Sequence, residues 1–236
     1  MQMLGLACAG SVAADASVGA AATRPADTMA ERVAACVACH GEQGRATTEG
    51  YYPRIAGKPA GYLFNQLVNF REGRRQNATM TYLVSNLPDT YLHEIAEYFS
   101  AQNPPYAPPQ RALASPAVLE RGRVLATAGD TSKNLPACTS CHGSALTGMA
   151  PAVPGLLGLP RDYLNAQFGA WSNLVRAAAA PDCMAQITGR LSAVDLGAVT
   201  AYLSAQTVPP HAAPAVPAAD KSKLPLQCGS IPRGTP

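Results

Sequence analysis

Apolar side chains recur every three to four residues in several segments of the chain, which predicts amphipathic helices. The clearest case is the segment 89–102, where the apolar positions are Tyr91, Leu92, Ile95, Tyr98 and Phe99. The same pattern predicts helices over residues 27–35, 57–70, 116–128, 160–174 and 192–206. Because no segment alternates persuasively between apolar and polar residues, the expected fold class is all-α.

An internal repeat divides the chain into two halves. Matched residues of the first half are Pro53, Gly57, Pro59, Tyr62, Leu63, Gln66 and Phe70, and they return at an offset of 101 as Pro154, Gly158, Pro160, Tyr163, Leu164, Gln167 and Trp171. After the loop 177–181 the offset is 104, so that Met80 returns as Met184 and the run 98–102 as 202–206. A repeat of this kind predicts two homologous domains.

Changes in composition suggest where the segments of the chain begin and end. We expect a leader at 1–22, a first domain at 23–103, a linker at 104–110, a second domain at 111–207 and a tail at 208–236. The prolines of the linker favour an extended, fairly stiff connector, which would restrict the orientation of the domains. The tail is rich in proline and alanine, so it is expected to be extended or partly disordered.

Four of the seven cysteines lie in two copies of the pattern Cys-x-x-Cys-His. The residues are Cys36, Cys39 and His40 in the first half and Cys138, Cys141 and His142 in the second. Two thiols at this spacing can form thioethers with both vinyl groups of a haem, while the adjoining histidine supplies a nitrogen to the iron. The two copies therefore predict two covalently bound haem c groups. The alternative, one zinc site with four cysteine ligands, leaves both histidines without a role.

A haem that carries electrons usually needs a second axial ligand, and a methionine thioether is the ligand that raises the reduction potential. Met80 lies 40 positions after His40, and Met184 lies 42 positions after His142. This matched spacing predicts Met80 and Met184 as the two ligands. Met149 lies only 7 positions after His142, so we expect it to pack in the haem pocket instead.

The charge of the chain excludes some partners. Charged residues make up only 14% of the chain and the net charge is +3, with no run of basic residues longer than Arg74-Arg75, so nucleic acid is not an expected partner. No apolar stretch reaches the roughly 20 residues that span a bilayer, which leaves terminal or peripheral membrane association.

We expect docking to redox partners through an apolar patch at a haem edge. Arg71, Arg74 and Arg75 are expected to form a solvated helix end.

The first 22 residues are small and mostly apolar, and Val12-Ala13-Ala14 offers a small-residue cleavage site. The segment resembles a secretory signal that lacks its basic start. A disordered alanine-rich leader is one alternative. A lipid-modified Cys8 is another, although Gly5 stands where a lipobox has a branched aliphatic residue.

Beyond the haem motifs, the first half carries a set of residues typical of one family. They are Pro53-Arg54-Ile55-Ala56-Gly57-Lys58, Tyr62, Gln66-Leu67, Asn69-Phe70, Gly73-Arg74, Met80, Ile95-Ala96, Tyr98 and Gln102. With these residues the chain resembles, over 27–207, the tandem di-haem class I cytochromes c of the cytochrome c4 type. The resemblance implies two class I cytochrome c domains, histidine and methionine ligation of both haems, haems that face each other across a domain interface, and a periplasmic location. It also suggests that Arg54 meets a haem propionate.

The second half departs from this pattern near its methionine. Trp171-Ser172-Asn173-Leu174 stands where the first half has Phe70-Arg71-Glu72-Gly73, and Cys183 directly precedes Met184. The Cys183 thiolate could compete as an iron ligand. In an oxidising compartment, a disulfide with Cys228 that pins the tail onto the second domain is the interpretation we prefer, although sequence alone does not establish its geometry.

Together these features predict an electron carrier rather than an enzyme. It would pass single electrons from a dehydrogenase or a quinol-oxidising complex to a terminal oxidase or other acceptor, and a specialised version would be the cytochrome subunit of a dehydrogenase. The alternative is a di-haem peroxidase, which needs an open position on one iron. Two matched methionines and the short halves argue against that alternative.

Overall fold

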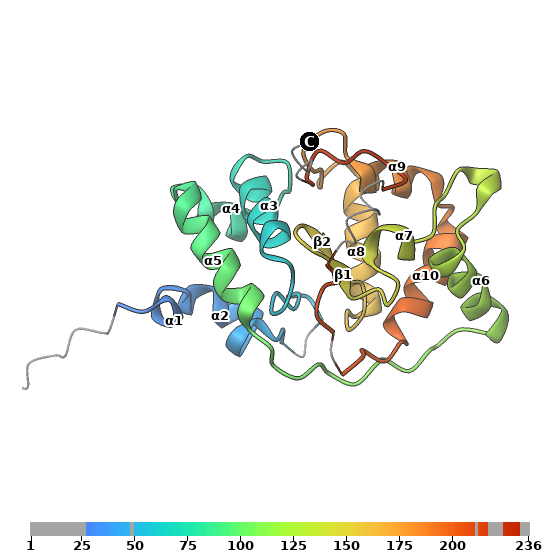
Figure 1. Cartoon of the computed structure of the whole chain (residues 1–236), viewed down its shortest axis with the longest axis horizontal. Coiled ribbons are helices and arrows are strands. Elements are labelled where there is room, and N and C mark those ends of the chain that lie inside the picture. Colours follow the sequence, from blue (N-terminus) through green and yellow to red (C-terminus); the bar gives the residue numbers. More distant parts are fainter. Residues whose placement is uncertain (1–26, 48–49, 211, 217–223, 232–236) are drawn as a thin grey trace, which may run out of the picture.

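The chain folds into two groups of helices that lie side by side (Figure 1). The first group consists of α1 (Met29–Arg32), α2 (Ala34–His40), η1 (Glu42–Gly44), α3 (Ala60–Arg71), α4 (Ala78–Val84) and α5 (Asp89–Ala101). The second group consists of α6 (Pro116–Thr127), η2 (Thr131–Lys133), α7 (Thr139–His142), β1 (Gly148–Met149), β2 (Val153–Pro154), α8 (Arg161–Ser172), α9 (Cys183–Arg190) and α10 (Ala193–Ser204). This computed structural model describes residues 27–47, 50–210, 212–216 and 224–231. The expected leader, with Cys8 and the cleavage site, lies outside these residues.

The six predicted helices form within a few residues of their expected bounds, but four further α-helices, α2, α4, α7 and α9, were not predicted. Two of these, α4 and α9, are 7 and 8 residues long and carry Met80 and Met184. Each begins at a polar cap: the side chain of Asn77 accepts a hydrogen bond from the backbone N–H of Met80, and that of Asp182 accepts one from Ala185. Helices of seven or eight residues cover only about two turns, so their caps are the sequence signal that could have revealed them.

A small hairpin in the second half adds to the helical pattern. Strands β1 and β2 pair antiparallel, with Gly148 opposite Pro154 and Met149 opposite Val153. Tail residue Ala215 extends this pairing, because its N–H donates to the carbonyl of Gly148 at 2.9 Å. Residues 212–216 of the tail therefore run beside the hairpin, whereas residues 224–231 form bends and a turn. Met149 takes part in the hairpin and is not among the residues that line the cavity of the second half, so its expected role in a haem pocket is wrong.

Each half has its own apolar core. In the first half, α3 packs on α5 around Leu63, Ile95 and Phe99. In the second half, α6 crosses α10 around Leu125, Val199 and Leu203. Burial of these side chains supplies the main driving force for folding of each half.

The two halves meet through equivalent loops that follow α3 and α8. Residues 74–76 lie antiparallel to residues 175–177, with Arg75 directly opposite Arg176. Backbone hydrogen bonds flank this pair, from Gln76 to the carbonyl of Val175 at 2.8 Å and from Ala177 to that of Arg74 at 2.6 Å. Because Arg75 and Arg176 are related by the repeat offset of 101, the contact has approximate two-fold symmetry.

Side chains follow the same symmetry. Arg75 donates to Gln66 in its own half at 3.0 Å and to Gln167 in the other half at 2.8 Å. Arg176 reciprocates, with bonds to Gln167 at 2.5 Å and to Gln66 at 3.2 Å. Each guanidinium also reaches the tyrosine hydroxyl of the opposite half, Tyr163 for Arg75 and Tyr62 for Arg176. The expectation that Arg75 belongs to a solvated helix end is therefore wrong, since its partners were out of reach of any local sequence pattern.

The linker is fastened to the first half by Arg54, which is only 4% exposed. Its guanidinium donates to the carbonyls of Pro104 at 2.6 Å and Pro105 at 3.1 Å and lies 3.8 Å from the ring centroid of Tyr106. This differs from the propionate contact suggested by the resemblance.

We predict that Gly122→Ala destabilises the second half strongly. A Cβ at Gly122 in α6 would lie 2.2 Å from the carbonyl oxygen of Ala198 in α10, so the crossing helices would have to separate. We expect a loss of about 2 to 3 kcal/mol in the free energy of unfolding, measured by chemical denaturation. Gly197→Ala in α10 is the control: its Cβ meets nothing within 4 Å, so it should gain roughly 0.5 to 1 kcal/mol. Equal effects of the two substitutions would contradict this packing.

Candidate haem sites

Both Cys-x-x-Cys-His motifs end in a buried histidine held by the same kind of contact. Helix α2 ends at His40 and α7 ends at His142, and each helix is followed by a glycine with positive φ, Gly41 at 75° and Gly143 at 83°. The two imidazoles are 8% and 7% exposed. Burial lowers the pKa of both rings, which favours their neutral form.

In each half, a proline carbonyl orients the imidazole. Nδ1 of His40 lies 2.9 Å from the carbonyl oxygen of Pro53, and Nδ1 of His142 lies 2.7 Å from that of Pro154. A neutral ring in this position carries its proton on Nδ1 and donates it to the carbonyl, which leaves a lone pair on Nε2. This is the tautomer and orientation that a metal-binding histidine requires.

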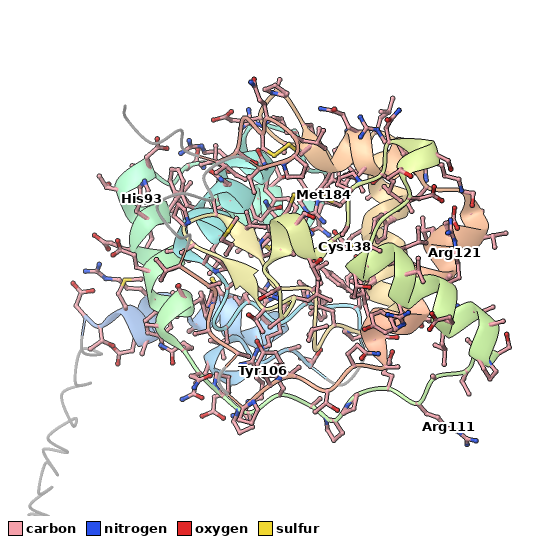
Figure 2. The ribbon with its side chains drawn as sticks, turned by 45° about the vertical axis from the view of Figure 1, so that its right-hand side comes forward. His93, Tyr106, Arg111, Arg121, Cys138 and Met184 are labelled. Atoms are coloured by element: carbon pink, nitrogen blue, oxygen red, sulfur yellow. A yellow bond between two sulfur atoms is a disulfide. The ribbon has the colours of Figure 1, made fainter. Side chains whose placement is uncertain are left out.

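In the second half, the structure brings all four predicted residues to one cavity. Cys138, Cys141, His142 and Met184 line it; Figure 2 labels Cys138, which caps the start of α7, and Met184, which lies in the first turn of α9. Most of its wall is apolar, including Leu125, Leu135, Leu164, Phe168, Val199 and Leu203. One neutral imidazole, one thioether and two thiols on an apolar wall fit a covalently attached haem.

The chemistry of the cysteines agrees with thioether formation. Burial raises the pKa of Cys36 and Cys141, and that of Cys138 to about 11. Their apolar surroundings keep the free thiols neutral, and a thioether, which carries no charge, is compatible with the same burial. No group of three or more histidine, cysteine or acidic residues that could hold a metal ion occurs in the described part of the chain, which includes all four motif cysteines. The alternative of one four-cysteine zinc site is therefore wrong.

The first half separates its predicted residues over two adjoining clusters. Cys36 packs against the cluster around Val33 and Ile95, and Met80 packs against the cluster around Val84. The clusters share three side chains, Phe64, Leu67 and Leu87. An apolar region therefore extends from the cysteine helix to the methionine helix in this half also.

Lys58 is a buried cation that the sequence did not lead us to predict as part of a site. Its side chain crosses from the first half to the second, where Nζ donates to the carbonyl of Gly155 at 2.9 Å. Gly155 follows Pro154, whose carbonyl holds His142, so the first half contributes directly to the loop that orients this histidine. The internal repeat contained a signal for this buried lysine, because Lys58 stands where the second half has the apolar Leu159.

The predicted disulfide between Cys183 and Cys228 is present, with Cα atoms 5.3 Å apart. It excludes Cys183 from competing with Met184 as an iron ligand, because its sulfur is already bonded. The disulfide also attaches the end of the tail to the first turn of α9.

Comparison with known proteins identifies the family. The thiosulfate dehydrogenase electron acceptor of Thiomonas intermedia is 34% identical over 177 residues, which cover 75% of this chain and 81% of that protein. Cytochrome c4 of Pseudomonas aeruginosa is 31% identical over 202 residues, or 85% of this chain and 92% of that protein. The chain belongs to the cytochrome c4 family. No family model matches it.

Solved structures of similar fold agree with the cytochrome c4 assignment. Reduced cytochrome c4 from Pseudomonas stutzeri matches with a TM-score of 0.65 and 28% identity, over 75% of this chain and 96% of that one. Thiosulfate dehydrogenase (TsdBA) from Marichromatium purpuratum matches with a TM-score of 0.64 and 30% identity. This second match covers 72% of this chain but only 36% of the TsdBA chain, so the present chain corresponds to about a third of it.

Membership of the cytochrome c4 family settles the fold class and the cofactor. The protein is an all-α, two-domain class I cytochrome that carries two covalently bound haem c groups, and its function is electron transfer. The relatives are named as cytochromes and electron acceptors, and they give no support to the peroxidase alternative. Within the described residues, no helix is both long enough and apolar enough to cross a membrane.

We predict that the buried Lys58 makes the free energy of unfolding depend on pH in the alkaline range. Burial lowers the pKa of its ammonium group to about 8, below the ordinary value of 10.5. Between these two values the unfolded chain binds more protons, so the free energy of unfolding should rise with pH, by up to about 3 kcal/mol in total. Below pH 8 both states are protonated and the full penalty of the buried charge remains.

Two variants test this dependence by chemical denaturation at pH 7 and pH 10. Lys58→Met should be more stable than the wild type at pH 7 and should lack the rise. Lys58→Arg keeps its charge over the whole range, so it should lose the rise without gaining stability. A wild-type rise that survives in Lys58→Met would show that another group is responsible.

Proposed function

We propose that each half of this cytochrome holds one haem between a histidine and a methionine. In the first half Cys36 and Cys39 would attach the haem, with His40 and Met80 as axial ligands. In the second half Cys138 and Cys141 would attach it, with His142 and Met184 as axial ligands. The observation that carries the proposal is the pair of equivalent bonds from His40 and His142 to proline carbonyls, which leave Nε2 of each ring available to an iron.

The haems supply one-electron chemistry, and the residues of the chain set its conditions. The apolar wall of the cavity excludes water, and a thioether ligand favours the reduced iron, so both raise the reduction potential. With a histidine and a methionine bound, neither iron would retain a position for a substrate. We therefore infer an electron carrier rather than an enzyme.

The donor that we propose is a thiosulfate dehydrogenase. Two relatives, from Thiomonas intermedia and Stutzerimonas stutzeri, are named as thiosulfate dehydrogenase electron acceptors, both at 34% identity. The match to about a third of a TsdBA chain supports the same partner. A quinol-oxidising complex is the second candidate donor, and the acceptor would be a terminal oxidase or another redox protein.

We also propose that the protein is exported to the periplasm and that its domains extend over 23–103 and 111–207, with 104–110 as the linker. The disulfide between Cys183 and Cys228 supports export, because such bonds persist in oxidising compartments. The hydrogen bonds from Arg54 to Pro104 and Pro105 support a linker held in one conformation. Peripheral membrane association would depend on the leader segment.

We predict that substitution of each methionine changes one haem only. Met80→Ala should remove methionine ligation at the first haem, and Met184→Ala at the second. Each should halve the weak long-wavelength absorption of methionine-ligated ferric haem and produce one high-spin iron. Met149→Ala, outside the cavity, is the matched control and should leave the spectrum unchanged. A full-strength band in Met80→Ala or Met184→Ala would refute that residue as a ligand.

Electron transfer with a purified thiosulfate dehydrogenase tests the proposed donor. Rapid mixing of the oxidised cytochrome with the dehydrogenase and thiosulfate should reduce both haems, and the rate should increase with cytochrome concentration. Thiosulfate without the dehydrogenase is the control. Reduction no faster than in this control would exclude the dehydrogenase as donor and would leave the quinol-oxidising complex to be tested in the same way.

A further inference from the structure

The tail segment 224–231 lies over the start of α9 and is covalently bound there (Figure 1). The disulfide joins Cys228 to Cys183, the residue directly before Met184. A backbone bond from the N–H of Gly229 to the carbonyl of Pro181, at 3.0 Å, adds a second attachment beside the first. The tail is thus anchored within three residues of the methionine proposed to bind the second haem.

This tail segment also forms part of the second-half cavity. Leu226, Cys228, Ser230 and Ile231 line the same cavity as His142 and Met184. Leu226 and Ile231 are half-buried, although both follow the last helix of the fold by more than twenty residues. They therefore contribute apolar surface where the two helical groups alone would leave the cavity incomplete.

Two further contacts show that the segment is closely fitted. The side-chain amide of Asn65, in α3 of the first half, donates to the carbonyl of Ser230 at 2.7 Å, so the tail bridges both halves. At Gly229 a Cβ would lie 2.1 Å from the carbonyl oxygen of Ala180, which leaves no space for a side chain. Only glycine allows the tail to approach the loop before α9 this closely.

The first half lacks the covalent part of this arrangement. The residue before Met80 is Thr79, where the second half has Cys183. Asn77 caps α4 in the first half, and no disulfide other than Cys183–Cys228 occurs among the described cysteines. The tail therefore distinguishes two sites that the repeat would otherwise make equivalent.

We propose that residues 224–231 form a disulfide-fastened wall of the second haem cavity, which holds the Met184 helix in place and closes that cavity to small ligands from solvent. The proposal rests on the proposed ligation of the second haem by Met184. Without the disulfide, the segment is held by a few hydrogen bonds and apolar contacts, so it should open locally far more often. Opening would expose the methionine side of the haem and allow an external ligand to displace Met184.

Imidazole binding to the oxidised, full-length holoprotein tests the wall. The informative variant is Cys183→Ser combined with Cys228→Ser, because it leaves no free thiol beside the iron. We expect imidazole to replace methionine at one haem about tenfold faster or more than in the wild type, seen as loss of half of the long-wavelength methionine band. The other half should be lost at the wild-type rate, because the first haem has no such wall.

A second pair of variants keeps the disulfide, in case the double variant does not fold. Ile231→Ala removes one apolar side chain from the wall and should also speed imidazole binding at one haem. Val216→Ala is the matched control, since Val216 lies in the tail but is 84% exposed and does not line the cavity. It should bind imidazole at the wild-type rate.

The outcomes separate this proposal from the ligand assignment. Wild-type imidazole rates in both the double-serine variant and Ile231→Ala, with a full methionine band before mixing, would overturn the wall and leave the ligand assignment intact. Acceleration of both haems together would also overturn it, because the tail would then act on the whole fold. A different observation would refute the ligand assignment, namely a full methionine band in Met184→Ala.

Discussion

The reciprocal pairing of Arg75 and Arg176 is the contact on which the arrangement of the two domains depends. Each arginine binds the glutamine of both halves, Gln66 and Gln167, so the two domains share one hydrogen-bond network. Arg176 is 6% exposed, and burial lowers its pKa, with the charge of Arg75 as a further cause. Among the described residues neither arginine has a carboxylate in an ion pair. The buried charge of Arg176, beside the half-buried Arg75, relies instead on the glutamine oxygens and on the ring of Trp171, whose centroid lies 3.9 Å from the guanidinium.

Two-fold pairing in a single chain also explains why the cavity of the second half has a wall from the first. The contact brings Tyr62 and Asn65 of α3 to the cavity that contains His142 and Met184. It also lets Lys58 reach the loop that orients His142. The second haem site is therefore a property of both domains together, and its environment would change if the domains separated.

The halves have diverged at positions that decide how each site is closed. Lys58 stands opposite Leu159 in the repeat, Arg54 opposite Gly155, and Thr79 opposite Cys183. Arg54 fastens the linker to the first half, whereas Cys183 fastens the tail to the second. The two sites thus share the contact between histidine and proline carbonyl, but different segments of the chain cover them. Because enclosure and hydrogen bonding tune reduction potential, the two haems should differ in potential.

The sequence by itself determined the features that depend on neighbours along the chain. The haem motifs and the longer helices follow from spacings of a few residues, and the repeat follows from comparing the sequence with itself at offsets of 101 and 104. The short helix α9 could have been recognised from its cap at Asp182. The disulfide was predicted because Cys183 and Cys228 were the cysteines left over in the mature chain. Three contacts were decided only by the tertiary structure. These are the pairing of Arg75 with Arg176, the hydrogen bond from Lys58 to the second half, and the packing of the tail against the cavity. Those contacts join residues about 48 to 165 positions apart, and no local pattern of apolar and polar residues records which distant surfaces will meet.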